Sequence, residues 1–195
     1  MTSASPLFAT AAAFPQTRYQ GSKRKLAGTI LQQMEGLTFT SVLDAFAGTA
    51  SISYAFKQAG KRVVYNDILS FNYQIGLALI ENDSVRLSDD DMAFVQARHG
   101  GLEYDDFIER TFEGIYFTRE ENRWLDLVCQ NIPRMSCPHR RALAWFAVFQ
   151  SAMIKRPYNL FHRGNLYMRL ASVQRTFGNK TTWDTSFEEW FRVFA

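Results

Sequence analysis

The sequence of 195 residues has little that would mark a disulfide-bonded, membrane or metal-binding protein. Cys129 and Cys137 are its only cysteines, too few for a disulfide scaffold or a zinc ribbon, so we expect a reduced, cytoplasmic protein. The longest purely apolar run, from Ala142 to Phe149, has eight residues. A membrane-spanning helix needs about 18, so we expect none. The three histidines lack the spacing of metal ligands, so we expect no metal site.

Acidic residues are absent from two stretches of a chain whose net charge is only +3. All charged residues within 18–25 and 155–180 are basic, which predicts two places that contact anions. We interpret the second stretch as a DNA-binding segment, in which cations meet phosphates and asparagines read base edges, although an ordinary basic loop is the alternative. The candidates are Lys155, Arg156, Asn159, Arg163, Asn165, Arg169, Arg175, Asn179 and Lys180.

The first part of the chain alternates between helical and strand patterns. Residues 1–14, rich in Ala, Ser and Thr, predict a flexible arm, and residues 15–82 predict an α/β unit. Within that unit the pattern predicts a helix that begins at Ser22 and strands over 39–43 and 62–65. Further helices are predicted over 52–59 and 68–80. Strands joined through a helix by short connections predict a parallel, Rossmann-like sheet.

The remaining residues, 83–195, predict a mostly helical region. A capping box from Thr118 to Glu121 marks the start of one helix, and Pro138 marks the start of another. Residues 187–194 predict a strongly aromatic C-terminal helix. Its aromatic side chains either cover a partner chain or pack on the helices of this one.

The first predicted strand runs into a turn that is suited to ligand binding. Asp44 ends the strand, Gly48 lies in the turn, and a helix follows, so backbone amides and a helix N-terminus would face a ligand. Asp67 ends the next strand 19 residues after Gly48, near the spacing of an acid that accepts hydrogen bonds from ribose hydroxyls. The unit is therefore suited to an adenosine-containing cofactor. A structural βαβ unit with a polar loop is the alternative.

The identity of this cofactor follows from what the turn lacks. It has one glycine where a dinucleotide fingerprint has three, which argues against NAD or FAD. Asp44 would repel a pyrophosphate but would favour a cationic group. S-adenosylmethionine carries an ammonium and a sulfonium and no phosphate, so we predict it as the cofactor. Lys23, at a helix start beside Gly21, is suited to bind the methionine carboxylate.

Three motifs in a fixed order carry a resemblance to a known family. They are Tyr19-Gln20-Gly21-Ser22-Lys23, then Asp44-Ala45-Phe46-Ala47-Gly48-Thr49, then Asn66-Asp67. In this order they resemble the D12 class of adenine-N6 DNA methyltransferases, the Dam-like enzymes. Residues 156–163, 165–169 and 177–180 also resemble members from restriction–modification systems. The resemblance implies S-adenosylmethionine as cofactor and double-stranded DNA as partner. It implies cofactor-binding roles for Tyr19, Gly21, Ser22, Lys23, Asp44, Phe46, Gly48 and Asp67.

Two features depart from the family's pattern. Ala50 stands where the family usually has glycine, and its methyl group would narrow the pocket. The catalytic motif Asp-Pro-Pro-Tyr has no counterpart, because the sequence contains no Pro-Pro pair. In the family this motif accepts the hydrogens of the poorly nucleophilic adenine amine and stacks on the flipped base.

The resemblance therefore implies the N-terminal part of a methyltransferase, which binds the cofactor and recognises DNA. Either a second subunit supplies the catalytic motif and the remaining strands of the sheet, or the chain is a truncated form. A non-catalytic DNA-binding or regulatory protein derived from a methyltransferase is the main alternative. A nicotinamide-dependent oxidoreductase and a methyltransferase acting on RNA or protein are two others.

Overall fold

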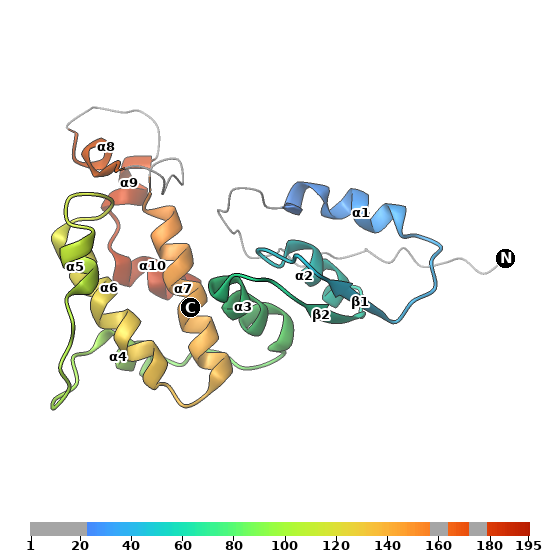
Figure 1. The fold of residues 1–195 in the computed structure, drawn as a ribbon, viewed down its shortest axis with the longest axis horizontal. Coiled ribbons are helices and arrows are strands. Elements are labelled where there is room, and N and C mark those ends of the chain that lie inside the picture. Colours follow the sequence, from blue (N-terminus) through green and yellow to red (C-terminus); the bar gives the residue numbers. More distant parts are fainter. Residues whose placement is uncertain (1–22, 157–163, 172–178) are drawn as a thin grey trace. The chain divides into compact units, whose positions relative to one another are not determined.

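A computed structural model describes residues 23–156, 164–171 and 179–195 of the chain, whose elements are labelled in Figure 1. The predicted arm over residues 1–14 lies outside these ranges. The chain divides into two compact units, Met1–Asp83 and Ser84–Ala195. The boundary between the units follows residue 83, whereas the change of sequence pattern indicates a boundary after residue 82.

A small parallel sheet forms the centre of the first unit. β1 (Ser41–Asp44) pairs with β2 (Arg62–Tyr65), and α2 (Ser51–Gln58) connects the two strands. The parallel sheet expected from the alternating pattern is thus confirmed, and β2 has its predicted bounds. β1 ends at Asp44, one residue later than predicted. Because Asp44 lies opposite Tyr65 in the register, both strands end at the same edge of the sheet.

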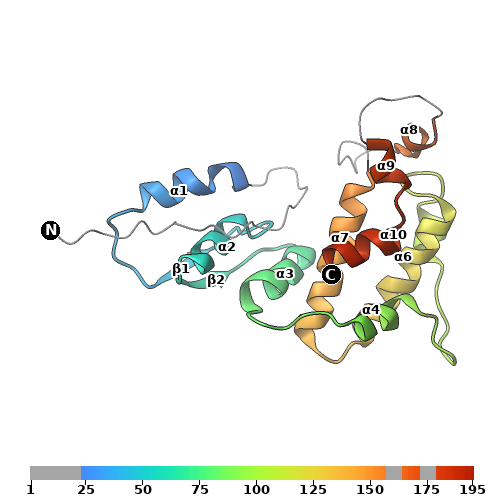
Figure 2. The ribbon, with the colours of Figure 1, turned by 180° about the vertical axis from the view of Figure 1, so that it is seen from behind.

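One face of this sheet is covered by helices. α1 (Ala27–Gln33) follows a 3-10 turn, η1 (Lys23–Leu26), and packs together with α2 (Figure 2). Leu31 of α1 and Phe56 of α2 are buried with Val42 and Val63, whose side chains point to this face. Ile30 and Met34 of the same chain segment pack against this cluster as well, whereas Leu26 is exposed.

The opposite face of the sheet carries apolar side chains that remain accessible. Leu43 and Val64 lie directly opposite each other in the register, and both are exposed. An open hollow beside them is lined by further apolar residues, among them Tyr73, Leu77 and Ile80. Within the described residues the sheet has only β1 and β2, so each strand has one unpaired edge.

A change of helix type separates the last two elements of the first unit. α3 (Ser70–Gly76) continues into a π-helical turn, η2 (Leu77–Glu81), where the sequence predicted one uninterrupted helix. The end of this turn is held by Lys57, whose Nζ donates to the carbonyls of Ile80 (2.8 Å) and Asn82 (2.6 Å). These carbonyls would otherwise lack partners, because the last turn of a helix leaves them unpaired.

The second unit is built from helices, as predicted. Two long helices, α6 (Arg119–Asn131) and α7 (Pro138–Ile154), are joined through a 3-10 turn, η3 (Ile132–Arg134). The capping box predicted at the start of α6 is confirmed: the Thr118 side chain accepts from the Glu121 amide, and Glu121 accepts from the Thr118 amide. The shorter helices are α4 (Asp89–Gln96), α5 (Phe107–Thr111), α8 (Leu166–Leu170), α9 (Asn179–Asp184) and α10 (Phe187–Phe194).

The aromatic C-terminal helix packs inside this unit. α10 lies against α7 (Figure 2), and Phe187 and Phe191 are fully buried. Phe187 stacks on Trp124 of α6 with 5.1 Å between the ring centroids. Of the two interpretations of these aromatics, packing on the chain's own helices therefore holds for Phe187 and Phe191. Val193 remains exposed.

Candidate functional site

The loop between β1 and α2 is held in a tight, left-handed shape. Gly48 has φ of +56° and Ala50 has φ of +66°, both in the region that favours glycine. The Ala50 amide donates to the carbonyl of Ala47 at 3.0 Å, and α2 starts directly afterwards. Ala50 is fully buried, so its methyl group packs inside the protein. The alanine at position 50 therefore costs backbone strain. Because its methyl group is buried, the expectation that this group narrows a pocket does not hold.

Asp67 ties this loop to the end of β2. Its Oδ2 accepts from the Gly48 amide at 2.8 Å, and its Oδ1 accepts from the Leu69 amide at 2.9 Å. Partial burial alone would raise the pKa of Asp67. Hydrogen bonds from the amide of Leu69, the side chain of Asn72 and the amide of Gly48 outweigh it, so the pKa lies below its ordinary value. The carboxylate is thus ionised at neutral pH and keeps further lone pairs for a ligand.

Asp44 lies at the same edge of the sheet as Asp67. It ends β1, and its Oδ2 accepts a hydrogen bond of 2.7 Å from the hydroxyl of Ser53 on α2. The structure therefore brings together Asp44, Gly48 and Asp67, the three residues that the spacing singled out. Two carboxylates beside one loop suit a ligand with cationic and hydroxyl groups better than one with phosphates.

Lys23 reaches the same loop from η1. Its Nζ donates to the carbonyl of Phe46 at 3.1 Å, and its charge also helps to lower the pKa of Asp67. The ring of Phe46 is exposed. Lys23 and Phe46 are thus at the loop, where the resemblance implied them to be. Tyr19, Gly21 and Ser22 lie outside the described residues, and their roles stay predictions.

Residues that were not among the predicted cofactor-binding residues also support the loop. The hydroxyl of Tyr65 donates to the carbonyls of Gly48 (2.5 Å) and Asn72 (2.9 Å). The side-chain amide of Asn66 donates to the carbonyl of Ala45 at 2.8 Å. Gly76 leaves room for the Tyr65 ring, because a Cβ there would lie 2.6 Å from Cδ1 of that ring. Only Asn66, beside the predicted acid, carried a sequence signal.

Three cations predicted to contact DNA are instead buried in the second unit. Lys155 and Arg156 are each 1% exposed, and Arg169 is 8% exposed. A buried cation offers no surface to a phosphate, so this interpretation is wrong for these three residues. Asn165 is also buried, which places it away from base edges. Asn159, Arg163 and Arg175 lie outside the described residues, and so do the side chains of Asn179 and Lys180 at the start of α9.

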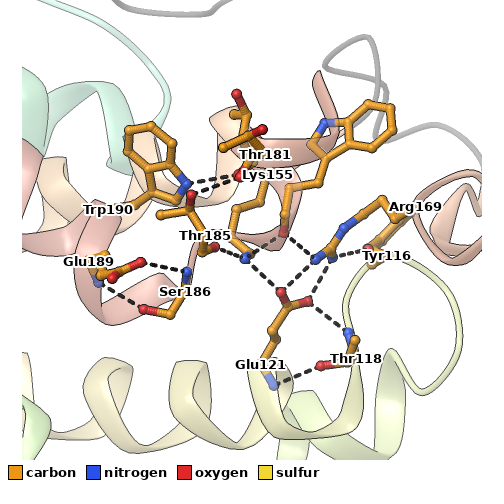
Figure 3. Close-up of polar contacts among 12 residues, drawn as sticks. Tyr116, Thr118, Glu121, Lys155, Arg169, Thr181, Thr185, Ser186, Glu189 and Trp190 are labelled. Atoms are coloured by element: carbon orange, nitrogen blue, oxygen red, sulfur yellow. Dashed lines mark hydrogen bonds and ion pairs between the residues drawn. The ribbon is translucent and has the colours of Figure 1, made fainter. Parts of the chain in front are cut away.

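The buried cations have partners inside the protein (Figure 3). Arg169 donates to both carboxylate oxygens of Glu121, at 2.7 and 2.6 Å, and Lys155 lies 2.8 Å from the same carboxylate. Lys155 also donates to the carbonyls of Trp183 (3.0 Å) and Thr185. Burial alone would raise the pKa of Glu121, but the hydrogen bonds from Arg169 and Lys155 lower it below its ordinary value. Sequence patterns gave Glu121 only the role of a helix cap.

Arg156 uses a different kind of partner. Its guanidinium lies over the ring of Tyr116, with 4.2 Å between the two centres. Burial lowers the pKa of Arg156 to about 10. The group still carries its positive charge at neutral pH, and the aromatic face stabilises that charge.

Metal sites and membrane-spanning helices are absent from the described residues. The described part of the chain has no cluster of three or more His, Cys, Asp or Glu side chains that could hold a metal ion. None of its helices is long and apolar enough to cross a membrane.

Comparisons with known proteins identify the family of the chain. A family model for the D12 class of N6 adenine-specific DNA methyltransferases matches residues 19–163. The chain is 34% identical over 149 residues to the Type II methyltransferase M2.HphI of Haemophilus parahaemolyticus. That alignment covers 76% of this chain and 43% of the relative, so the chain spans less than half of the relative's length. No solved structure matches the chain significantly. The chain therefore belongs to the D12 class of N6 adenine-specific DNA methyltransferases.

Proposed function

We propose that this chain binds S-adenosylmethionine and recognises DNA as part of an adenine-N6 DNA methyltransferase. The observation that carries the proposal is the hydrogen bond between the Gly48 amide and Asp67, with Asp44 at the same sheet edge. This arrangement offers two carboxylates and a loop backbone to one ligand. Family membership supports the same cofactor.

Each residue of the site has a definite role in this proposal. Asp67 accepts hydrogen bonds from the ribose hydroxyls through the lone pairs that Gly48 and Leu69 leave free. Asp44 attracts the ammonium group of the methionine part. Lys23 provides the positive charge beside the loop that suits the methionine carboxylate. When bound, S-adenosylmethionine supplies the electrophilic methyl group.

A second chain supplies the catalytic motif in this proposal. The amine of adenine is a poor nucleophile, so an enzyme must hold the flipped base and accept hydrogen bonds from its amine. This sequence has no Pro-Pro pair to form the Asp-Pro-Pro-Tyr motif. The unpaired strand edges and the exposed Leu43 and Val64 are suited to further strands that would carry it.

Calorimetric titration with S-adenosylmethionine tests the cofactor site. Asp67→Ala and Asp44→Ala should each weaken binding by about 10- to 100-fold, the typical cost of losing a hydrogen bond to a charged group. Asp90→Ala removes an exposed acid of the second unit and should leave the affinity unchanged. Wild-type affinity in both site variants would remove Asp44 and Asp67 from the proposal.

A methyl-transfer assay tests the requirement for a second chain. It uses labelled S-adenosylmethionine and duplex DNA, with this chain alone and with a candidate chain that carries Asp-Pro-Pro-Tyr. We expect transfer only in the mixture. Transfer by this chain alone would contradict the split enzyme. If DNA is bound but no methyl group is transferred, by the chain alone or by the mixture, a non-catalytic DNA-binding protein is favoured. The missing catalytic motif supports this alternative.

A further inference from the structure

The short helix α8 presents two apolar side chains outward. Tyr167 is 71% exposed and Leu170 is 66% exposed, whereas Leu166 and Arg169 of the same helix are buried. The two exposed residues are three positions apart, so they share one side of the helix. The helix thus has an inner side that binds the rest of the unit and an outer apolar side.

α8 is too short to be stable alone, yet it is firmly attached. The amides of Asn165 and Leu166 both donate to the carbonyl of Ile115, at 3.0 and 3.1 Å. On the inner side, the guanidinium of Arg169 makes two hydrogen bonds to Glu121 and a third, of 3.1 Å, to the carbonyl of Trp183 (Figure 3). These contacts fix the direction in which the outer side faces.

A bidentate, buried anchor of this kind is a strong constraint on position. Arginine and carboxylate match each other in two parallel hydrogen bonds, which sets orientation as well as distance. Met168 and Arg169 separate the two exposed residues in the sequence, and the helical turn places Arg169 on the opposite side of the helix from them. Holding Arg169 inward therefore holds Tyr167 and Leu170 outward.

The sequence around α8 indicates what the outer side contacts. Residues 157–180 contain no Asp or Glu, and Arg163, Arg175 and Lys180 are close in sequence to the helix. The positive charge of this stretch of sequence favours a polyanion as its partner. Of the polyanions, nucleic acids alone offer flat apolar bases beside the charges, which suit an aromatic ring.

We propose that Tyr167 and Leu170 contact DNA bases directly, as an apolar wedge at a base step, and that Arg169 and Glu121 position this wedge. Apolar side chains are known to insert between base pairs and unstack them. The inference rests on the proposed function, because it requires that the chain binds DNA. In this proposal two uncharged residues contribute affinity for DNA that does not depend on the base sequence.

Binding of a fluorescein-labelled DNA duplex, followed by anisotropy over a range of salt concentrations, tests the wedge. Tyr167→Ala and Leu170→Ala should each weaken binding about tenfold. Because no charge is lost, the slope of log affinity against log salt should stay at the wild-type value; loss of a phosphate contact would reduce it by about one. Tyr167→Phe keeps the ring and should bind within about twofold of wild type.

Val193→Ala is the matched control, because Val193 is 67% exposed on another helix of the same unit. It should not change DNA affinity. Duplexes containing 2-aminopurine add a second measurement, since its fluorescence rises when the base is unstacked. We expect this rise with wild type and Tyr167→Phe and a smaller one with Tyr167→Ala.

The outcomes separate this inference from the function on which it rests. If wild type binds the duplex and both alanine variants bind equally well, the wedge is wrong and DNA binding stands. A reduced salt slope in the alanine variants would also overturn it, because it would show altered phosphate contacts. If wild type shows no DNA binding, the proposed DNA recognition fails, and the wedge fails with it.

Discussion

The backbone amide of Gly48 donates a hydrogen bond of 2.8 Å to Oδ2 of Asp67, 19 positions further along the chain. The bond joins the loop after β1 to the end of β2, the two places where a parallel sheet of this kind binds ligands. The carboxylate therefore supports the loop, and under the proposed function the same carboxylate also binds the cofactor. The pH dependence of stability reports on the first of these roles.

Asp67→Asn should lower the free energy of unfolding by about 1 kcal/mol at neutral pH, because the amide is a weaker acceptor than the carboxylate. The pKa of Asp67 is lowered in the folded protein from 3.8. Its stabilising contribution is thus complete above pH 3.8 and is lost as the pH falls through the folded pKa. Urea unfolding at several pH values should show the difference from wild type shrinking below about pH 3.8. A difference that persists in acid would contradict the assignment to the carboxylate.

Ala50 offers a test of backbone strain. Replacing it with glycine relieves about 1–2 kcal/mol of left-handed strain but loses a buried methyl and frees the unfolded chain, each worth about 0.5–1 kcal/mol. Ala50→Gly should therefore stay within about 1 kcal/mol of wild type in stability. Ala50→Val adds a branched side chain at a fully buried position with φ of +66°, and should cost more than about 2 kcal/mol. Equal stability of the two variants, by thermal unfolding, would contradict this account.

Glu121→Gln should destabilise the second unit by about 3–5 kcal/mol, because it leaves Lys155 and Arg169 buried without their anion. The pKa of Glu121 is lowered from 4.5, so its contribution is present above pH 4.5 and is lost as the pH falls through the lower folded value. The variant should therefore lose less stability than wild type on acidification. Glu120→Gln, at the neighbouring exposed position, is the control and should unfold like wild type.

The two cysteines should differ in reactivity. Burial raises the pKa of Cys129 from 9.0 to about 12, so its thiolate population at neutral pH falls about a thousandfold. A thiol-specific disulfide reagent should modify the native protein at Cys137, as mass spectrometry of peptides would show. Cys137→Ser should then resist labelling until urea unfolds it. Rapid labelling of Cys129 in the native variant would show that this helix opens readily.

The site in the first unit was accessible from sequence because its residues are close to strand ends. Asp44, Gly48 and Asp67 each follow a strand pattern at a characteristic spacing, and the parallel sheet brings them together. Ser53 and Tyr65 could not be found this way. Their hydroxyl groups donate to residues 9 and 17 positions away, and no local pattern distinguishes such a hydroxyl from any other.

The charges of the second unit were misinterpreted for a related reason. Lys155 and Arg169 belong to a stretch without acids, so the sequence indicated cations that face an external anion. Their anion is internal: the Glu121 carboxylate comes from α6, 48 positions before Arg169. A charge pattern shows only which residues are neighbours along the chain, whereas an ion pair forms between residues that are close in space. Family membership, in contrast, followed from motif order and did not depend on these contacts.

The carboxylate of Glu121 also caps α6, because its Oε2 accepts from the Thr118 amide at 2.9 Å. Fraying of the first turn of α6 and release of α8 therefore disturb the same oxygen atoms, and the two events are thermodynamically coupled. The exchange rate of the Thr118 amide hydrogen thus reports on a helix about 50 residues later in the chain. A ligand that stabilises α8 should therefore slow the exchange of the Thr118 amide hydrogen. This one backbone proton thus reports on binding at the outer side of α8.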